Sequence, residues 1–191
     1  MIRETLRALA ACAVTFVVCA VVYPAFVWGI AQLAFPSSAA GSLVHHRDRT
    51  VIGSELIAQP FASDRYFHPR PSAVDYKADA TGGSNLATTN PDLAAKVAER
   101  AKALDTAKNG PAPVELVTAS GSGVDPHISP ETARYQAPRV AEARGLSLER
   151  VRALIDARVE NSGAIIGAPA RVNVLLLNLD LDAEPAPRRP L

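Results

Sequence analysis

Hydrophobic positions along the chain form one uncharged run near its start, followed by a longer part in which apolar and polar residues are mixed. The run covers residues 8–35 and contains no charged side chain. An α-helix rises about 1.5 Å per residue, so roughly 20 apolar residues cross the hydrocarbon core of a membrane. We therefore expect a single membrane-spanning helix, with its hydrocarbon-spanning portion from Leu9 to about Trp28.

Charges on the two sides of the run predict its orientation. Arg3, Arg7 and the terminal amino group precede it, and positive charge beside a first membrane helix stays in the cytoplasm. Arg47 and Arg49 oppose this bias from the far side, but they lie more than ten residues beyond the run. A secretory signal peptide has an apolar core of only about 7–15 residues, which favours a retained anchor. We expect residues 1–7 in the cytoplasm, residues 8–35 in the inner (cell) membrane and its outer edge, and residues 36–182 in the periplasm.

Aromatic residues and a proline crowd the outer part of the run. Tyr23 and Trp28 are suited to the headgroup level, and Pro24 removes one helical hydrogen bond, which predicts a mild kink. Tyr23, Pro24 and Trp28 are therefore candidates for packing against another membrane helix. An ordinary anchor with an incidental proline is the alternative.

The part after the run shows both helical and strand-like patterns and predicts one α+β domain. Residues 51–57, followed by Phe61, are expected as a short strand pair or as a strand plus a turn, with a break at Gly53. Further strands are expected over residues 114–118 and over residues 172–181, where apolar residues alternate. Residues 37–42 are expected as a small-residue linker, residues 65–76 as a shaped loop and residues 183–191 as a loose, proline-rich tail.

Helix starts and stops have clear local signals. Asn90 followed by Pro91 predicts a helix that runs to about residue 107. Ser129 is expected to cap one helical turn, and Pro138 to begin a second segment that ends at Gly145. Ser147 is expected to cap the next helix, with a stripe formed by Leu148, Val151, Leu154, Ile155 and Val159.

Composition narrows the range of functions. Of 20 basic and 19 acidic residues, only Arg3, Arg7 and Glu4 precede the run. The remainder carries 18 of each, so a surface for nucleic acid is not indicated. Cys12 and Cys19 are the two cysteines of the chain and both lie in the run. The predicted domain therefore has neither disulfides nor thiolate-bound metal.

Residues 118–130 contain the best candidate for chemistry. Six residues of this loop carry the prediction: Ser120, Gly121, Ser122, Gly123, Asp125 and His127. A serine hydrolase would use Ser120 or Ser122 as nucleophile and His127 as base, but Ser122 lacks the flanking glycines of a nucleophile elbow. A metal site would need Asp125, His127 and a third ligand from His45, His46 or His68. The simplest interpretation is an internally hydrogen-bonded turn, with glycines at positive φ and Asp125 and Ser129 capping backbone groups, that is also free to face a partner.

Several of these blocks together resemble the KdpC family, the C subunits of the Kdp potassium-transporting P-type ATPase. The resemblance covers nearly the whole chain and depends on Tyr23-Pro24, residues 53–61, 66–72, 82–86, 89–91, 117–130 and 171–174, and Asn178. Ala58 departs from it, since glycine is expected there.

The resemblance implies a single anchor and a periplasmic domain, bound to a channel-like potassium-binding subunit and to a P-type ATPase subunit. It implies a non-catalytic accessory subunit of a high-affinity potassium uptake complex, with no cofactor of its own, because ATP is hydrolysed on another subunit. The role implied is assembly or stabilisation of the complex, together with action at the external ion entrance or an increase in the ATP affinity of the pump. Direct nucleotide contact conflicts with the predicted topology. The alternative is a membrane-anchored periplasmic serine hydrolase using Ser120 or Ser122 with His127.

Overall fold

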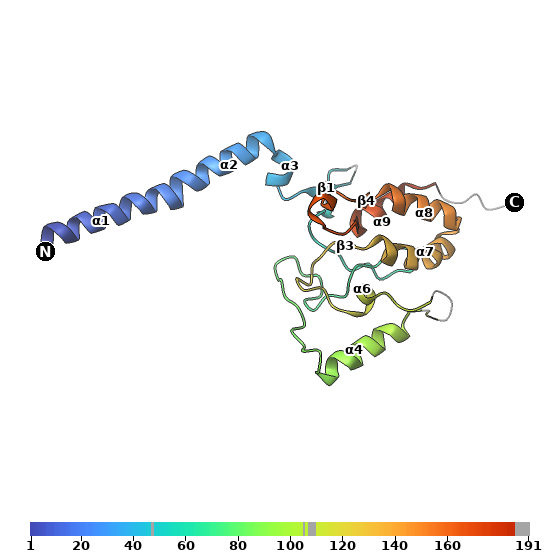
Figure 1. Ribbon diagram of the computed structural model, residues 1–191. Helices are drawn as coiled ribbons and strands as arrows, with labels where there is room; N and C mark the ends of the chain where they lie inside the picture. Colours follow the sequence, from blue (N-terminus) through green and yellow to red (C-terminus); the bar gives the residue numbers. More distant parts are fainter. Residues whose placement is uncertain (47, 105, 107–109, 186–191) are drawn as a thin grey trace. The chain divides into compact units, whose positions relative to one another are not determined.

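A computed structural model describes residues 1–185 apart from residues 47, 105 and 107–109 (Figure 1). The chain forms two compact units, the first from Met1 to Ile52 and the second from Gly53 onward. The first contains the long apolar helix and the second contains a mixture of helices and short strands, so the architecture is α+β as predicted.

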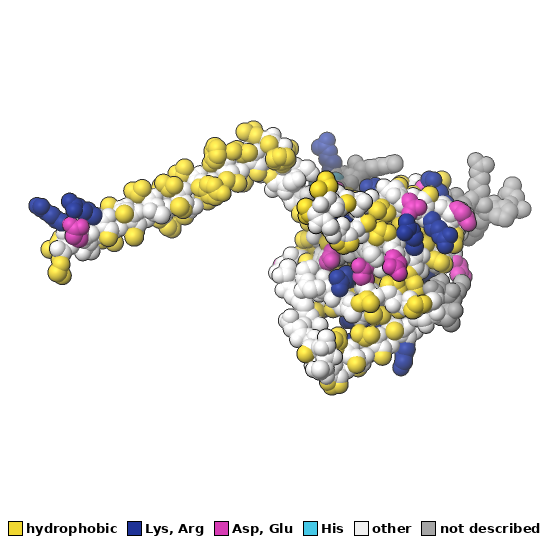
Figure 2. Space-filling view, viewed as in Figure 1, with side chains coloured by type: hydrophobic (Ala, Val, Ile, Leu, Met, Phe, Trp, Pro, Cys, Tyr) yellow, Lys and Arg dark blue, Asp and Glu magenta, His cyan; other side chains and the backbone are white. Residues whose placement is uncertain are grey.

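The N-terminal helix is long enough and apolar enough to cross a membrane. It consists of α1 (Ile2–Val17), the π-helical turn η1 (Val18–Val22) and α2 (Tyr23–Ala34), which together form a 33-residue candidate span. Among residues 1–185 as the structure describes them, no neighbour buries any residue of this helix. Figure 2 shows apolar side chains along its length, with charged side chains at its N-terminal end. The helix is a candidate span for the predicted membrane anchor, although it begins about six residues earlier than the uncharged run.

Pro24 affects the hydrogen bonds of the turn that precedes it. The backbone N–H of Tyr23 bonds to Val18 O, five residues back. Proline has no N–H, and its ring crowds the carbonyl four residues earlier, which here belongs to Ala20. A π-turn widens the helix at that point, and such turns occur where the regular ladder is interrupted.

The segment after the anchor is more ordered than the predicted linker. It contains the single helical turn α3 (Pro36–Ala39) and the strands β1 (Leu43–His45) and β2 (Val51–Ser54), which pair with each other. Of the two alternatives for residues 51–57, the structure has the strand followed by a turn, with the strand ending at Ser54. Gly53 lies inside β2 and does not interrupt it. A Cβ at Gly53 would lie 1.9 Å from Gln59 Nε2, so the close approach of this side chain explains the glycine.

Three helices and a small sheet form the core of the second unit. The helices are α7 (Pro130–Arg144), α8 (Leu148–Ala157) and α9 (Val174–Ala183), and α8 contacts both of the others. The antiparallel sheet has the order β3-β5-β4, from β3 (His127–Ile128), β4 (Val159–Glu160) and β5 (Arg171–Asn173). Val172 is opposite both Ile128 and Val159. The fully buried side chains include Phe67, Ile128, Val140, Val151, Ile155, Val172 and Leu177.

The prediction of a strand over residues 172–181 is wrong beyond Asn173. The side-chain oxygen of Asn173 accepts the N–H of Leu176 at 3.2 Å and begins α9. The buried residues Val174, Leu177, Asn178 and Leu181 are spaced by three or four positions, as on one helical face. The leucine-rich sequence satisfies both periods, so alternation alone does not distinguish a strand from a helix.

Three further predictions differ from the structure. Residues 114–118 contain the helical turn α6 (Val114–Val117) instead of a strand, and Pro113, at its N-cap, does not donate a backbone hydrogen bond. Pro138 lies inside the continuous helix α7 and does not begin a new one. The apolar stripe expected in the helix after Ser147 does not include Val159, because this residue belongs to β4.

The predicted caps are confirmed. Asn90 accepts the N–H of Asp92 at the start of α4 (Pro91–Lys102), and Ser129 and Ser147 cap α7 and α8. Gly145 ends α7 with φ of +67°. Helix α4 ends at Lys102, not near residue 107, and residues 105 and 107–109 lie outside the described residues, as does the tail from residue 186.

The predicted loop over residues 65–76 is also confirmed and is attached to the core. Phe67 is fully buried, and both its backbone groups bond to the side-chain amide of Asn178, at 2.8 and 3.0 Å. Arg144 donates to the carbonyls of Arg65 and Leu181 and pairs with Asp182. One buried amide and one buried guanidinium thus hold the start of this loop in place.

Candidate functional site

The predicted loop between Thr118 and Pro130 is a compact turn held by its own side chains. The hydroxyl of Ser120 accepts the N–H of Gly123 at 3.2 Å, and the hydroxyl of Ser122 accepts the N–H of Val124 at 3.2 Å. The two hydroxyl oxygens are 3.3 Å apart. Ser120 is only 2% exposed, whereas Gly121 and Ser122 are exposed.

Backbone hydrogen bonds join this loop to three segments that are distant in sequence. Ser120 donates to Pro71 O at 2.9 Å, Gly82 donates to Ser122 O at 2.8 Å, and Ala58 donates to Val124 O at 2.9 Å. These segments include the blocks around residues 58, 71 and 82 that were singled out in the sequence. The blocks therefore form one connected cluster.

Gly123 allows the close approach of these segments. Its φ is +73°, and a Cβ there would lie 2.6 Å from Val74 Cγ2 and 2.7 Å from Gly82 O. Gly121 does not have positive φ and has open space around its Cα. The expectation of left-handed glycines in the turn is thus correct for Gly123 and wrong for Gly121.

Asp125 and His127 interact locally. The N–H of His127 donates to Asp125 Oδ1 at 3.0 Å, and His127 Nδ1 lies 3.6 Å from the same oxygen. Interaction with the His127 side chain is the main cause that lowers the pKa of the Asp125 carboxyl, and the nearby charge of Arg70 contributes to the same shift. His127 thus pairs with Asp125, while the serine hydroxyls bond within the turn. This arrangement does not support a nucleophile and base.

Glu115 and Arg70 hold the two ends of the loop. Glu115 Oε2 accepts the N–H of Ser129 at 2.8 Å. Burial alone would raise the pKa of Glu115, but its hydrogen bonds from Ser129 and Thr132 outweigh burial and lower the pKa. Arg70 donates to Ala119 O at 3.3 Å. The loop is therefore fixed from both sides by charged side chains.

Metal binding finds no support in the geometry. Within the part of the chain that the structure describes, no three His, Cys, Asp or Glu side chains are arranged to hold an ion. His68 Nε2 lies 3.1 Å from Ser63 O, and His46 Nδ1 lies 3.3 Å from Asp48 Oδ1. His46 and His68, two of the three proposed third ligands, thus have local partners.

The candidate residues of the anchor lie on an uncovered part of the helix. Tyr23 and Trp28 are 64% and 66% exposed, and Pro24 is exposed beside them. Together with Phe26, they form an aromatic segment at the start of α2.

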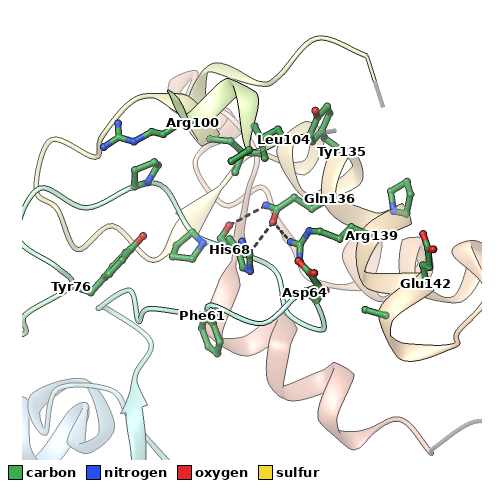
Figure 3. Close-up of a pocket in the computed structure, with 16 residues that line it drawn as sticks. Phe61, Asp64, His68, Tyr76, Arg100, Leu104, Tyr135, Gln136, Arg139 and Glu142 are labelled. Carbon is green, nitrogen blue, oxygen red and sulfur yellow. Dashed lines mark hydrogen bonds and ion pairs between the residues drawn. The ribbon is translucent and has the colours of Figure 1, made fainter. Parts of the chain in front are cut away.

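A cavity that the sequence did not predict lies between the 61–76 segment, α4 and α7. Its volume is about 800 Å³. Figure 3 shows Gln136 and Arg139 of α7 next to His68 and Asp64, with Arg100 and Tyr76 along another wall. Gln136 Oε1 accepts hydrogen bonds from the backbone N–H of His68 at 2.9 Å and from Arg139 Nη2 at 2.9 Å. Burial lowers the pKa of His68. Gln136 and Arg139 are polar residues three positions apart on α7, a helix with a buried face. This spacing was the sequence signal that could have revealed the network.

Comparison with known proteins gives a consistent result. The chain matches the family described as "KdpC: K+-transporting ATPase, c chain" over residues 5–183. It is 51% identical over 188 residues to a potassium-transporting ATPase KdpC subunit of Myxococcus xanthus, covering 95% of this chain and 89% of the relative. It is 52% identical over 171 residues to that of Geobacter metallireducens, covering 87% and 90% of the two chains. For that of Pseudomonas aeruginosa, the identity is 49% over 181 residues, covering 95% and 97%.

Proposed function

This chain belongs to the KdpC family of potassium-transporting ATPase subunits, and on that premise we propose that it is a non-catalytic accessory subunit that assembles and stabilises the complex. The observation that carries the proposal is the difference between the two parts of the chain. One long apolar helix is not covered by any residue that the structure describes, while the second unit has its most distinctive loop held by internal hydrogen bonds.

The proposed partners are a channel-like potassium-binding subunit and a P-type ATPase subunit that hydrolyses ATP. Tyr23, Pro24 and Trp28 are proposed to pack on a membrane helix of a partner, because the π-turn and the exposed aromatic rings provide a specific surface. In the 118–130 loop, exposed Gly121 and Ser122 are proposed to face a partner. Buried Ser120 and Gly123, together with half-buried Asp125 and His127, would hold this edge in shape.

The proposed location is the inner membrane, with the N-terminus in the cytoplasm and the second unit in the periplasm. Arg3 and Arg7 precede the uncharged run of the helix and support this orientation. The domain would then act near the external ion entrance. An increase in ATP affinity would have to be transmitted through the partners, because nucleotide is on the other side of the membrane.

The proposal is tested by deleting the chain in cells that otherwise carry the whole complex. Potassium uptake at low external potassium should be lost, and the two partners should no longer purify together in mild detergent. Normal uptake after deletion, together with recovery of this chain as a lone monomer, would contradict the proposal. A serine-reactive fluorophosphonate should leave Ser120 and Ser122 unlabelled, which checks the non-catalytic part.

A further inference from the structure

The tip of the β4–β5 hairpin presents two uncovered isoleucines. The strands pair through Val159 with Val172 and Glu160 with Arg171, and residues 161–170 connect them. Ile165 is 99% exposed and Ile166 is 86% exposed. No residue from 161 to 170 is charged. Isolated exposed apolar residues are ordinary, but a pair of almost fully exposed isoleucines in an uncharged turn marks a contact surface.

The turn is built to keep this shape. The N–H groups of Ala164, Ile166, Gly167 and Ala168 all bond to carbonyls within the turn, at 3.0–3.1 Å. Gly167 has φ of +78°, and a Cβ on Gly163 would lie 2.6 Å from Ala168 Cβ. Since these N–H groups are already satisfied, the tip can enter an apolar environment without leaving these donors unpaired. Its ordered shape also lowers the entropic cost of binding.

Charges at the base of the hairpin are paired within the domain. Arg171 bonds to Glu160 at 3.1 Å, and Arg158 bonds to Asp180 at 2.6 Å. The tip itself has neither the aromatic nor the basic residues that anchor proteins at a lipid surface. A neutral, apolar protein surface is therefore the better match.

The size of the tip also indicates what kind of contact it makes. Two isoleucine side chains cover roughly 300 Å², whereas each partner in a stable complex buries about 800 Å². The tip is too small to hold two copies of this chain together by itself. It is sufficient as a secondary contact in a chain whose membrane helix already keeps it close to its partner, because tethering raises the effective concentration.

We propose that Ile165 and Ile166 at the hairpin tip dock into an uncharged apolar pocket on another protein subunit of the transport complex, an inference that rests on the proposed function. The contact would fix the second unit on its partner independently of the anchor. Sequence reasoning did not identify this surface, because a short Ile pair between glycines has no period.

Site-specific photo-crosslinking identifies what the tip touches. The full-length chain carries p-benzoylphenylalanine in place of Ile165 in cells that contain the complete complex. Irradiation should give an adduct whose mass equals this chain plus one other subunit. The absence of any protein adduct, as expected for a lipid contact, or an adduct of two copies of this chain would overturn the inference.

A matched pair of double variants tests whether the contact matters. I165S/I166S should reduce recovery of the partner subunits in detergent roughly tenfold, since burial of the two side chains is lost. I165V/I166V keeps the tip apolar and should retain them. Both variants should have the same melting temperature as the unsubstituted chain, because the replaced side chains are exposed. Equal recovery with both variants would overturn the inference alone, whereas failure of the unsubstituted chain to co-purify would overturn the proposed function.

Discussion

At Gly123 the backbone conformation and the surrounding space both require the absence of a side chain. Gly123→Ala would place a Cβ 2.6 Å from Val74 Cγ2 on a residue with φ of +73°. The left-handed conformation and the overlap should together lower the free energy of unfolding by about 2–4 kcal/mol. Urea unfolding of the full-length chain in mild detergent measures this loss.

Gly121→Ala is the matched control, because no atom lies within 4 Å of its Cβ position. It should change the free energy of unfolding by less than about 0.5 kcal/mol. Equal destabilisation by the two variants would show that the sterically restricted geometry at Gly123 is not the cause.

His68 gives the domain a pH dependence. Burial is the largest cause that lowers its pKa below 6.5, and the charge of Arg139 adds to the shift. The unfolded chain therefore binds a proton at higher pH than the folded chain does. This contribution to stability is complete above about pH 6.5 and is lost as the pH falls from there toward the folded pKa.

The measurement compares melting temperatures at pH 7.5 and pH 5.5 for the unsubstituted chain and for His68→Gln. Other groups contribute to both proteins, so the difference between them reports on His68. On acidification, the melting temperature of the unsubstituted chain should fall by more than that of the variant. An identical loss in both would show that His68 does not titrate in this window.

At the scale of elements, local chemistry decided which predictions succeeded. Asn90, Ser129 and Ser147 begin helices, and Gly145 ends one, because a cap needs only residues a few positions away. The alternating leucines after Val172 suit either a strand or a helix, and packing of α9 in the core selected the helix. Pro138 remained within α7, because tertiary packing overrides its tendency to end a helix.

The same limit applies to the candidate loop. Its internal turn follows from neighbouring serines, glycines and Asp125, so the sequence predicted it. Its bonds to Pro71, Gly82 and Ala58 join residues 40–66 positions apart, and no local pattern encodes such pairing. The cavity beside His68 and Gln136 was missed for the same reason.

Asn173 and Asn90 allow a comparison of two caps in different surroundings. Asn90→Ala removes a cap from an exposed position and should cost about 1 kcal/mol of unfolding free energy. Asn173 is 3% exposed and also donates to Glu55 O at 2.8 Å. Asn173→Ala should therefore cost about 2–4 kcal/mol, because a buried bond is lost in addition to the cap. Denaturant titration of both variants decides the order, and an equal cost would contradict a structural role for the bond to Glu55.

At the scale of the whole molecule, the anchor determines on which side of the membrane every later residue lies. Alkaline phosphatase is active only outside the cytoplasm and should be active when fused behind Leu191. Green fluorescent protein fused at the same position should be exported by the same route and should therefore not fluoresce. The physical cause is the positive charge of Arg3 and Arg7 in the first turns of the 33-residue helix, ahead of its uncharged run. Replacing both by glutamate should lower phosphatase activity per fusion molecule, whereas Arg47→Glu with Arg49→Glu should not. A bright fluorescent fusion and an inactive phosphatase would place the domain in the cytoplasm. Contact at the external ion entrance would then be ruled out, while direct contact with nucleotide would become feasible.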